Sequence, residues 1–239
     1  MQSSFTAGIG PMNSKSGTES HRYSERINAI KRSIIMWKFM KHYALEIYTV
    51  IAMLLITLVA MFMDNLTVIQ QFAVWVSFLC ILHEWEEGRF PGGFLDLISG
   101  YVLQMDIDKE TKLGSRLITA VFIFTITLVP FFFGDRIPMF AVAMASFCIF
   151  EGIIHVVGIK IFQREKPYTP GLVTAEIELV TGISLIIYLA VNHLGAWYDY
   201  TFGPFVFIAC FACMQRSLMG MIGLRYKDMF AIMKKRFGR

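Results

Sequence analysis

The sequence predicts an all-α, polytopic membrane protein: a bundle of six transmembrane helices preceded by an N-terminal amphipathic helix. Two observations predict this fold class. Of the 239 residues, 56% are hydrophobic and only 17% are charged, which is a far more apolar composition than that of soluble domains. The chain also contains six apolar windows, each long enough to cross a hydrocarbon layer of about 30 Å as a helix.

The region before the first window divides into two parts. Residues 1–23 are polar, with many Ser and Gly, and lack the pattern of a cleavable signal peptide, so we expect a flexible leader. In residues 24–42, apolar side chains alternate with Arg and Lys, which predicts a basic amphipathic helix on an anionic membrane surface. Docking of this helix on the bundle is an alternative that the sequence leaves open.

The transmembrane domain is expected at residues 43–224. Its spans are predicted at residues 43–63, 68–88, 115–133, 137–162, 171–192 and 203–224. Lys and Arg are concentrated before the first span and after the second, fourth and sixth, whereas the other three loops contain only Arg136. Because cytoplasmic loops carry the positive excess, we expect both termini, including a basic tail at 225–239, to be cytoplasmic. The net charge of +4 then reflects topology, and we expect no nucleic-acid partner.

Ionisable residues within the spans are the strongest indication of function. A charged side chain inside a membrane is costly unless it faces a partner, a cavity or a metal, so it marks a candidate functional site. The helix rise places carboxylates and imidazoles of spans 2, 4 and 5 at one depth, in the cytoplasmic half of the membrane. The candidate metal ligands are His83, Glu86, Glu87, Glu151, His155 and Glu178.

Helical spacing also places these side chains on shared faces. His83, Glu86 and Glu87 converge because residues three and four apart are neighbours on a helix, and the two candidates on span 4 are also four apart. On span 5, Glu178 and Glu176 point to nearly opposite sides. We prefer Glu178, because small and hydroxyl-bearing residues share its face, and keep Glu176 as the alternate.

Four carboxylates at one depth would repel one another in the absence of a cation. Carboxylates combined with imidazoles are the ligands of carboxylate-bridged di-metal centres in helix bundles. We therefore expect metal ions as cofactors, in a di-metal centre, with iron or manganese favoured over zinc. A single zinc would need only three or four of these ligands. Ion or proton conduction and purely structural pairing are the alternatives.

Further residues are candidates for roles around the metal. Tyr168, in the loop before span 5, can donate a hydrogen bond into the site, and we group it with Glu86 and Glu87 as candidates for catalysis. Arg216 could bind an anionic group of the substrate or neutralise a glutamate. The apolar segment at 94–105 is too short to span and is expected to be interfacial or re-entrant beside the site. Candidates for contacts to the substrate or to the metal ligands are Glu84, Thr174, Gln215 and Arg216.

Two motifs in this order resemble those of the HXXEE membrane protein family. The first is His83-x-x-Glu86-Glu87, and the second is Tyr168-Thr169-Pro170-Gly171. The second signature of the family is Tyr-Ser-Pro-Gly, so Thr replaces Ser here and keeps the hydroxyl. The resemblance covers about residues 45–220. The family has no assigned activity, so the resemblance implies that these positions matter and implies no reaction.

These observations lead to the hypothesis of a membrane metalloenzyme whose site opens to the cytoplasmic leaflet. Its partners would be membrane lipids and a lipophilic small-molecule substrate, and a homo-oligomer or a membrane complex stays open. With iron the reaction would be oxidation or desaturation, and with zinc it would be hydrolysis of a lipid ester or amide. A cation or proton transporter or channel would need a polar route across the outer halves of spans 2 and 4, which are apolar. A third alternative is an assembly or scaffold subunit.

Overall fold

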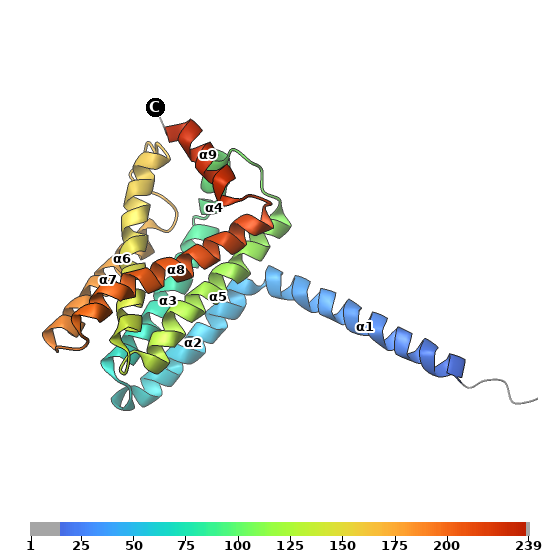
Figure 1. The fold of residues 1–239 in the computed structure, drawn as a ribbon, viewed down its shortest axis with the longest axis horizontal. Helices are drawn as coiled ribbons and strands as arrows, with labels where there is room; N and C mark the ends of the chain where they lie inside the picture. The colour runs from blue at the N-terminus through green and yellow to red at the C-terminus, as the bar shows by residue number, and fades with distance from the viewer. Residues whose placement is uncertain (1–14, 238–239) are drawn as a thin grey trace, which may run out of the picture. The chain divides into compact units, whose positions relative to one another are not determined.

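The computed structural model of the protein describes residues 15–237. Within this part the chain forms nine α-helices and no strand, which confirms the all-α prediction (Figure 1). The helices are α1 (Lys15–His42), α2 (Ala44–Phe62), α3 (Val68–Gly88), α4 (Phe94–Leu97), α5 (Lys109–Phe133), α6 (Pro138–Ile161), α7 (Leu172–Val191), α8 (Trp197–Met221) and α9 (Tyr226–Phe237). Two short segments complete them: η1 (Met63–Asn65), a 3-10 helix, and η2 (Ile98–Leu103), a π-helix.

Six helices are long and apolar enough to cross a membrane, as predicted: α2 together with η1, then α3, α5, α6, α7 and α8. Helices α5 and α8 begin before their apolar windows, because a carboxylate satisfies a free backbone N–H at each start. The Asp108 side chain accepts a hydrogen bond from the Thr111 N–H at 3.0 Å, and Asp199 accepts one from the Ala196 N–H at 2.8 Å. The cytoplasmic location of both termini stays a prediction.

Helix α1 belongs to a unit of its own, which ends at Met40. It begins at Lys15, so helical structure starts within the segment that the sequence assigns to a leader. Residues 1–14 of that leader lie outside the described part of the chain. Apolar side chains of α1 such as Ile30 and Ile34 are at least 50% exposed. The placement of α1 on a membrane surface stays a prediction.

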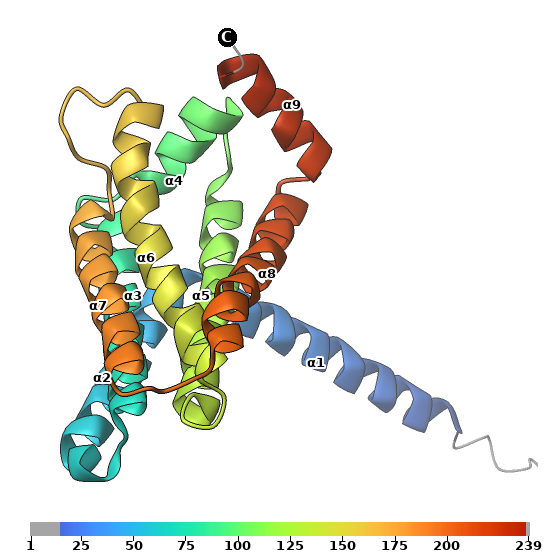
Figure 2. The same cartoon turned by 60° about the vertical axis from the view of Figure 1, so that its left-hand side comes forward.

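Helix α6 lies at the centre of the bundle, packed against α7, α8 and α5 (Figure 2). Many of its buried side chains are small, such as Ala141, Ala145 and Cys148. Small residues let helix backbones approach closely, which is how helices associate in lipid, where apolar burial drives little. On α7, Gly182 completes the contact: a Cβ there would lie 2.7 Å from the Ala145 carbonyl oxygen and 2.9 Å from the Cys148 Cβ.

Helix α3 is anchored to α2 at the end where its acidic residues lie. The Trp85 indole N–H donates a 2.7 Å hydrogen bond to the Thr49 hydroxyl. One turn further on, the Arg89 guanidinium forms an ion pair with Glu46. Because α3 also packs against α5 and α7, the last turns of α3 are held from three sides.

The apolar segment after α3 is too short to cross a membrane. The chain turns at Gly92 and Gly93, whose φ angles of 75° and 95° are accessible mainly to glycine. It then forms α4 and η2, a short apolar segment that fits the expected interfacial or re-entrant element. The Phe94 ring stacks on the His155 ring, with 5.0 Å between their centroids, so this segment lies beside the predicted site. Helix α9 packs against η2.

The substitution Gly182→Leu should destabilise the bundle. A side chain at this position has to displace the α6 backbone, and overpacking of this kind costs about 1–3 kcal/mol. The free energy of unfolding, measured in detergent with a denaturant series, should fall by this amount. Gly220→Leu is the matched control, because no atom lies within 4 Å of an added Cβ there. Equal losses in both variants would contradict the close contact of α6 and α7.

Candidate metal centre

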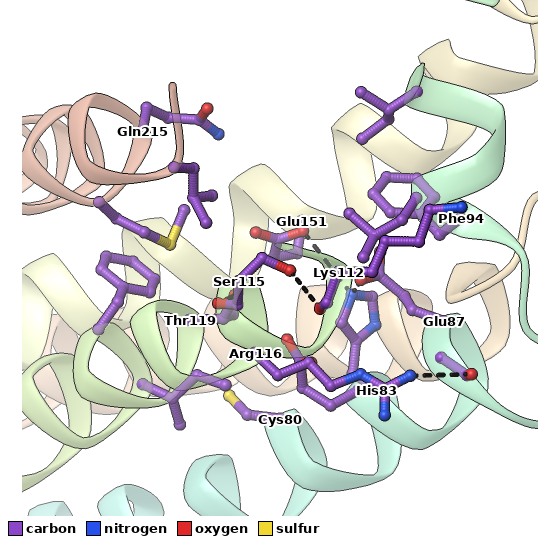
Figure 3. Close-up of a pocket in the computed structure, with 18 of the residues that line it drawn as sticks. Cys80, His83, Glu87, Phe94, Lys112, Ser115, Arg116, Thr119, Glu151 and Gln215 are labelled. Atoms are coloured by element: carbon purple, nitrogen blue, oxygen red, sulfur yellow. Dashed lines mark hydrogen bonds and ion pairs between the residues drawn. The ribbon is translucent and has the colours of Figure 1, made fainter. Parts of the chain in front are cut away.

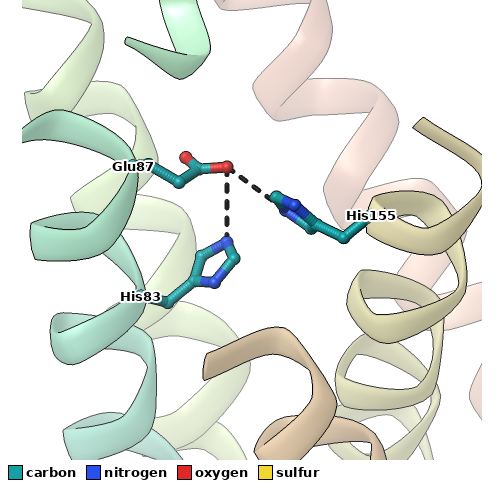
Figure 4. A group of neighbouring side chains, drawn as sticks. All are labelled: His83, Glu87 and His155. Carbon is teal, nitrogen blue, oxygen red and sulfur yellow. Dashed lines mark ion pairs between the residues drawn. The ribbon is translucent and has the colours of Figure 1, made fainter. Parts of the chain in front are cut away.

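Two histidines and two glutamates on α3 and α6 converge on one point. His83 and Glu87 lie four residues apart on α3, and Glu151 and His155 lie four apart on α6. The Glu87 Oε1 lies 3.4 Å from the His83 Nε2 and 3.3 Å from the His155 Nε2 (Figure 4). The Glu151 Oε2 lies 3.9 Å and 3.8 Å from the same two nitrogens. These four residues are called the His/Glu cluster below.

The distances within the cluster suit a bound metal ion. Bonds from zinc to imidazole nitrogen and carboxylate oxygen are about 2.0–2.2 Å, so ligand atoms around a tetrahedral ion lie about 3.3–3.6 Å apart. One ligand atom each from His83, Glu87 and His155 lies within 4.8 Å of the other two. The Glu151 carboxylate lies slightly further from the two histidine nitrogens, at a distance that would let it contact a water or substrate molecule bound to the same ion.

Hydrogen bonds fix which ring nitrogen of each histidine faces the cluster. The His83 Nδ1 lies 3.0 Å from the Thr174 hydroxyl, which donates its own proton to Glu86 at 2.7 Å. The His155 Nδ1 lies 3.2 Å from the Thr169 hydroxyl, which donates to the His155 carbonyl oxygen at 3.3 Å. A hydroxyl has one proton, so a threonine that donates it to one of these oxygens accepts from Nδ1–H. We assign the Nδ1–H form to both histidines, which leaves the Nε2 lone pairs directed at the cluster.

The Nε2 of His155 is buried and lacks a hydrogen bond of acceptable geometry among the described residues. Its lone pair faces the Glu87 carboxylate at 3.3 Å. Two electron-rich atoms in a buried site repel each other unless a cation lies between them. The cluster therefore requires either protons or a metal ion.

Glu86 has a different environment from Glu87. Its two oxygens accept four hydrogen bonds: from the Tyr168 hydroxyl at 2.9 Å, the Val173 N–H at 3.1 Å, the Thr174 N–H at 2.9 Å and the Thr174 hydroxyl at 2.7 Å. The two N–H groups belong to the first turn of α7, where helices have no internal partners and carry partial positive charge. The preceding residue, Gly171, has no side chain that could cap them. Glu86 therefore caps α7 from α3, and this geometry favours capping over metal ligation.

Tyr168 reaches Glu86 and not the ligand atoms of the cluster. Burial, and then its hydrogen bond to the Glu86 carboxylate, raise the pKa of Tyr168 to about 12. The phenol therefore stays protonated and donates to Glu86 throughout the physiological range. This placement favours a positioning role over the predicted catalytic one.

Gly171 lies against the cluster. Its φ angle is 94°, and a Cβ at this position would lie 2.6 Å from the His155 Cε1 and 2.8 Å from both the His83 Cε1 and the Glu87 Cγ. Space and backbone conformation both require glycine here. The second motif thus supports the first: its tyrosine contacts Glu86, its threonine orients one histidine, and its glycine admits both rings. The sequence motif indicated that this segment matters. The roles of Thr169 and Gly171 could not be predicted from it, because they depend on contacts with residues distant in sequence.

Glu178 is the inward-facing acid of α7, as preferred from the sequence. Its side chain is fully buried and interacts electrostatically with His83 and Glu87. Neither oxygen has a hydrogen bond of acceptable geometry among the described residues, and the Cys80 thiol, a weak donor, is an interacting group. Glu176 is only half-buried. Neither glutamate belongs to the group of ligand atoms that lie within 4.8 Å of one another.

The cluster borders a cavity of about 460 Å³ (Figure 3). In the view of Figure 3, Glu151 and His83 lie between Gln215 on one side and Phe94 and Lys112 on the other. Glu84 and Gln215 line this cavity, as the sequence suggested for substrate contacts, whereas Arg216 is exposed and does not line it. The volume lies in the range of about 300–1,000 Å³ that small-molecule sites have.

Comparison with known proteins agrees with the motifs. The model of the family described as "Protein of unknown function with HXXEE motif" matches residues 74–189. This segment is an HXXEE domain. The HXXEE domain contains the His/Glu cluster, Glu86 and the second motif, and it is narrower than the resemblance at about 45–220 expected from the sequence. No curated protein and no solved structure matched the chain.

The substitution Gly171→Ala should disrupt the cluster. The added methyl group would overlap both histidine rings, so we expect metal affinity to fall by at least about 10-fold, as for loss of other groups that orient ligands. Isothermal titration of metal-free protein with Zn²⁺ or Fe²⁺ measures this effect. Gly93→Ala is the matched control: its φ is 95°, and no atom lies within 4 Å of an added Cβ. Equal effects would show that backbone strain alone is responsible.

The substitution Glu86→Gln separates capping from ligation. An amide cannot accept from all four donors, so the free energy of unfolding should fall by about 1–3 kcal/mol. Metal should still bind at saturation, with an affinity lower by about 10–100-fold because Thr174 no longer holds His83 as firmly. Denaturant unfolding and metal titration check the two parts. Complete loss of metal from a folded variant would instead identify Glu86 as a ligand.

Proposed function

We propose that this HXXEE domain is a membrane-embedded metalloenzyme that acts on a lipophilic substrate bound in the adjoining cavity. One observation carries the proposal: a carboxylate oxygen of Glu87 lies 3.3–3.4 Å from imidazole nitrogens of both His83 and His155, and the three ligand atoms lie within 4.8 Å of one another at the edge of a largely apolar cavity. His83, His155 and Glu87 would hold the ion.

The donor set supports one ion more directly than the di-metal centre expected from the sequence. Glu86 is occupied by the α7 N-terminus, which leaves the pair of histidines with Glu87 as the compact ligand group. Two histidines and one carboxylate bind Fe²⁺ in oxygenases and Zn²⁺ in hydrolases, with a position left for water or substrate. The preference for iron or manganese stays a prediction, and Glu178 is the residue through which a second ion could be held.

The position of Glu151 favours hydrolysis. Its Oε2 lies 3.8–3.9 Å from both Nε2 atoms, compared with 3.3–3.4 Å for the Glu87 Oε1. A carboxylate placed there can accept a proton from a water molecule that an ion has made acidic. Its proton would then be available for a leaving group. We therefore propose hydrolysis of an ester or amide as the reaction, with oxidation as the second candidate because the donor set also suits Fe²⁺.

Conduction by the same carboxylates receives less support. On the other side of the cluster, α3 and α6 contribute a core that includes Ala73, Val76 and Met144. Polar side chains in that region, such as Ser77 and Thr127, donate to carbonyl groups of their own helices at 2.9 Å and 2.8 Å. A transported ion would need ligands along its route.

Metal analysis of the purified protein tests the proposal. We expect about one ion per chain in the wild type, and its loss in His155→Ala, because truncation leaves two of three ligands. Glu151→Gln should keep the ion and lose activity, since an amide cannot accept the proton. His193→Ala is the control, because His193 lies in the loop between α7 and α8. A wild type without stoichiometric metal after reconstitution would refute the proposal, and two ions per chain would restore the di-metal centre.

A further inference from the structure

The cavity is bounded by α3, α4, α5, α6 and α8, and its walls differ from end to end. Its apolar part is formed by aromatic and aliphatic side chains of α5, α6 and α8. These include Phe122, Ile123, Phe147, Phe150, Phe211 and Met214. The basic side chains that line it, Lys109, Lys112 and Arg116, all lie in the first two turns of α5.

The order of these groups along the helices follows from the helix rise. Residues 109 and 123 of α5 are separated by about 21 Å along its axis, at 1.5 Å per residue. Arg116 donates a 3.2 Å hydrogen bond to the Gly88 carbonyl at the end of α3, so this arginine is level with the acidic turn of α3. The His/Glu cluster therefore flanks the middle of the cavity, with the lysines towards one end and Ile123 towards the other.

Two of the helices that bound the cavity, α6 and α8, separate towards the end where the lysines lie (Figures 1 and 2). Helices α6 and α8 cross and then diverge, which Figures 1 and 2 both show. The two helices approach closely at Gly203, where an added Cβ would lie 2.6 Å from the Val142 Cγ1. Further along both helices, the rings of Phe150 and Phe211 lie 5.1 Å apart. Beyond these rings, Ile154 of α6 and Leu218 of α8 line the cavity, and Ile154 is 36% exposed. Both helices are long and apolar enough to cross a membrane, so an opening of the cavity between these two side chains would face the hydrocarbon layer.

Charge distinguishes the end at which a polar head group would lie. Lys112 pairs with Asp96 at 2.6 Å, and Glu84 interacts electrostatically with Arg116. Lys109 forms no ion pair or hydrogen bond with the described side chains. Four carboxylates and three basic side chains line the cavity. With a divalent ion in the cluster, the positive charges would exceed the negative charges by one. The loaded cavity therefore favours an anionic group at the α5 end.

We propose that the cavity binds a membrane lipid that has an anionic, phosphate-bearing head group, and that this lipid is the substrate. The acyl chain passes between α6 and α8 into the apolar part, the head group lies at Lys109 and Lys112, and the linkage between head and chain lies against the cluster. This inference rests on the proposed function and specifies its substrate. The hydrolysis it implies is balanced by water: the ester or amide bond breaks, the acyl carbon gains the hydroxyl, and the leaving group takes the proton held by Glu151.

Photocrosslinking tests this inference in the full-length protein. The probe is phosphatidic acid with a diazirine in its acyl chain, incorporated into phosphatidylcholine vesicles that contain the protein. We expect adducts on α5, α6 and α8 peptides that contain Phe122, Phe147 and Phe211, identified by mass spectrometry. Unlabelled phosphatidic acid should compete, and additional phosphatidylcholine should not. Adducts spread evenly over the exposed faces of the spans, or equal competition by both lipids, would overturn the inference.

Matched variants test the route and the head-group site. Ile154→Trp should abolish the cavity adducts by filling the gap between α6 and α8, whereas Ile153→Trp, on the exposed neighbouring position, should leave them unchanged. Lys109→Gln should weaken competition by phosphatidic acid about fivefold, the factor for one lysine near an anionic membrane surface. Lys160→Gln, which does not line the cavity, is its control. Identical results for each variant and its control would contradict the proposal.

His83→Ala distinguishes the two proposals from each other. This variant should lose the metal and keep the chain adducts, because the apolar walls do not depend on the ion. Its preference for phosphatidic acid over phosphatidylcholine should decrease, since the cavity loses two positive charges. A wild type that binds stoichiometric metal without cavity adducts refutes the lipid inference alone. Cavity adducts in a wild type that binds no metal refute the metalloenzyme and leave lipid binding as the finding.

Discussion

The capping of α7 by the Glu86 carboxylate is the interaction on which the site depends. The first turn of α7 starts where the chain re-enters the bundle, and N–H groups without partners are costly in an apolar environment. Glu86 satisfies two of them at 2.9–3.1 Å and binds the Thr174 hydroxyl as well. Because that hydroxyl then accepts from His83, the cap also determines the tautomer of a cluster histidine. It holds Gly171, which precedes the turn, against both rings.

The residues of the acidic turn of α3 therefore have different roles. Successive residues of a helix are separated by about 100°, so five neighbouring residues face every side of α3. Trp85 contacts α2, Glu84 faces the cavity, Glu86 caps α7, and Glu87 joins the cluster with a partner four residues before it. The high charge density of this turn does not require one large metal centre. Each charge meets a different partner, which is how a membrane helix can carry so many ionisable groups.

Hydropathy and helix rise predict the six spans and the common depth of the ionisable residues, because both depend only on local sequence. The preference for Glu178 over Glu176 could also be predicted from the sequence, since small residues mark a helix contact. The capping of α7 by Glu86 could not be predicted. Glu86 and Glu87 are three and four residues from His83, and both spacings place a side chain on the same face. Only the position where α7 begins distinguishes them. Similarly, Gln215 and Arg216 are adjacent, and the sequence of α8 contains no signal for its rotation about its own axis.

The chemistry of the cluster follows from counting lone pairs and charges. Both Nε2 atoms face carboxylates, since both Nδ1–H groups are used by threonines. One proton could satisfy only one of the two nitrogens, and the other would still oppose the Glu87 oxygen at close range. Two protons would satisfy both and leave two cationic rings with centroids 4.9 Å apart. A divalent ion would contact both nitrogens at once and would balance the charges of Glu87 and Glu151. For this reason we propose a metal ion, rather than protonated histidines, as the cation of the cluster.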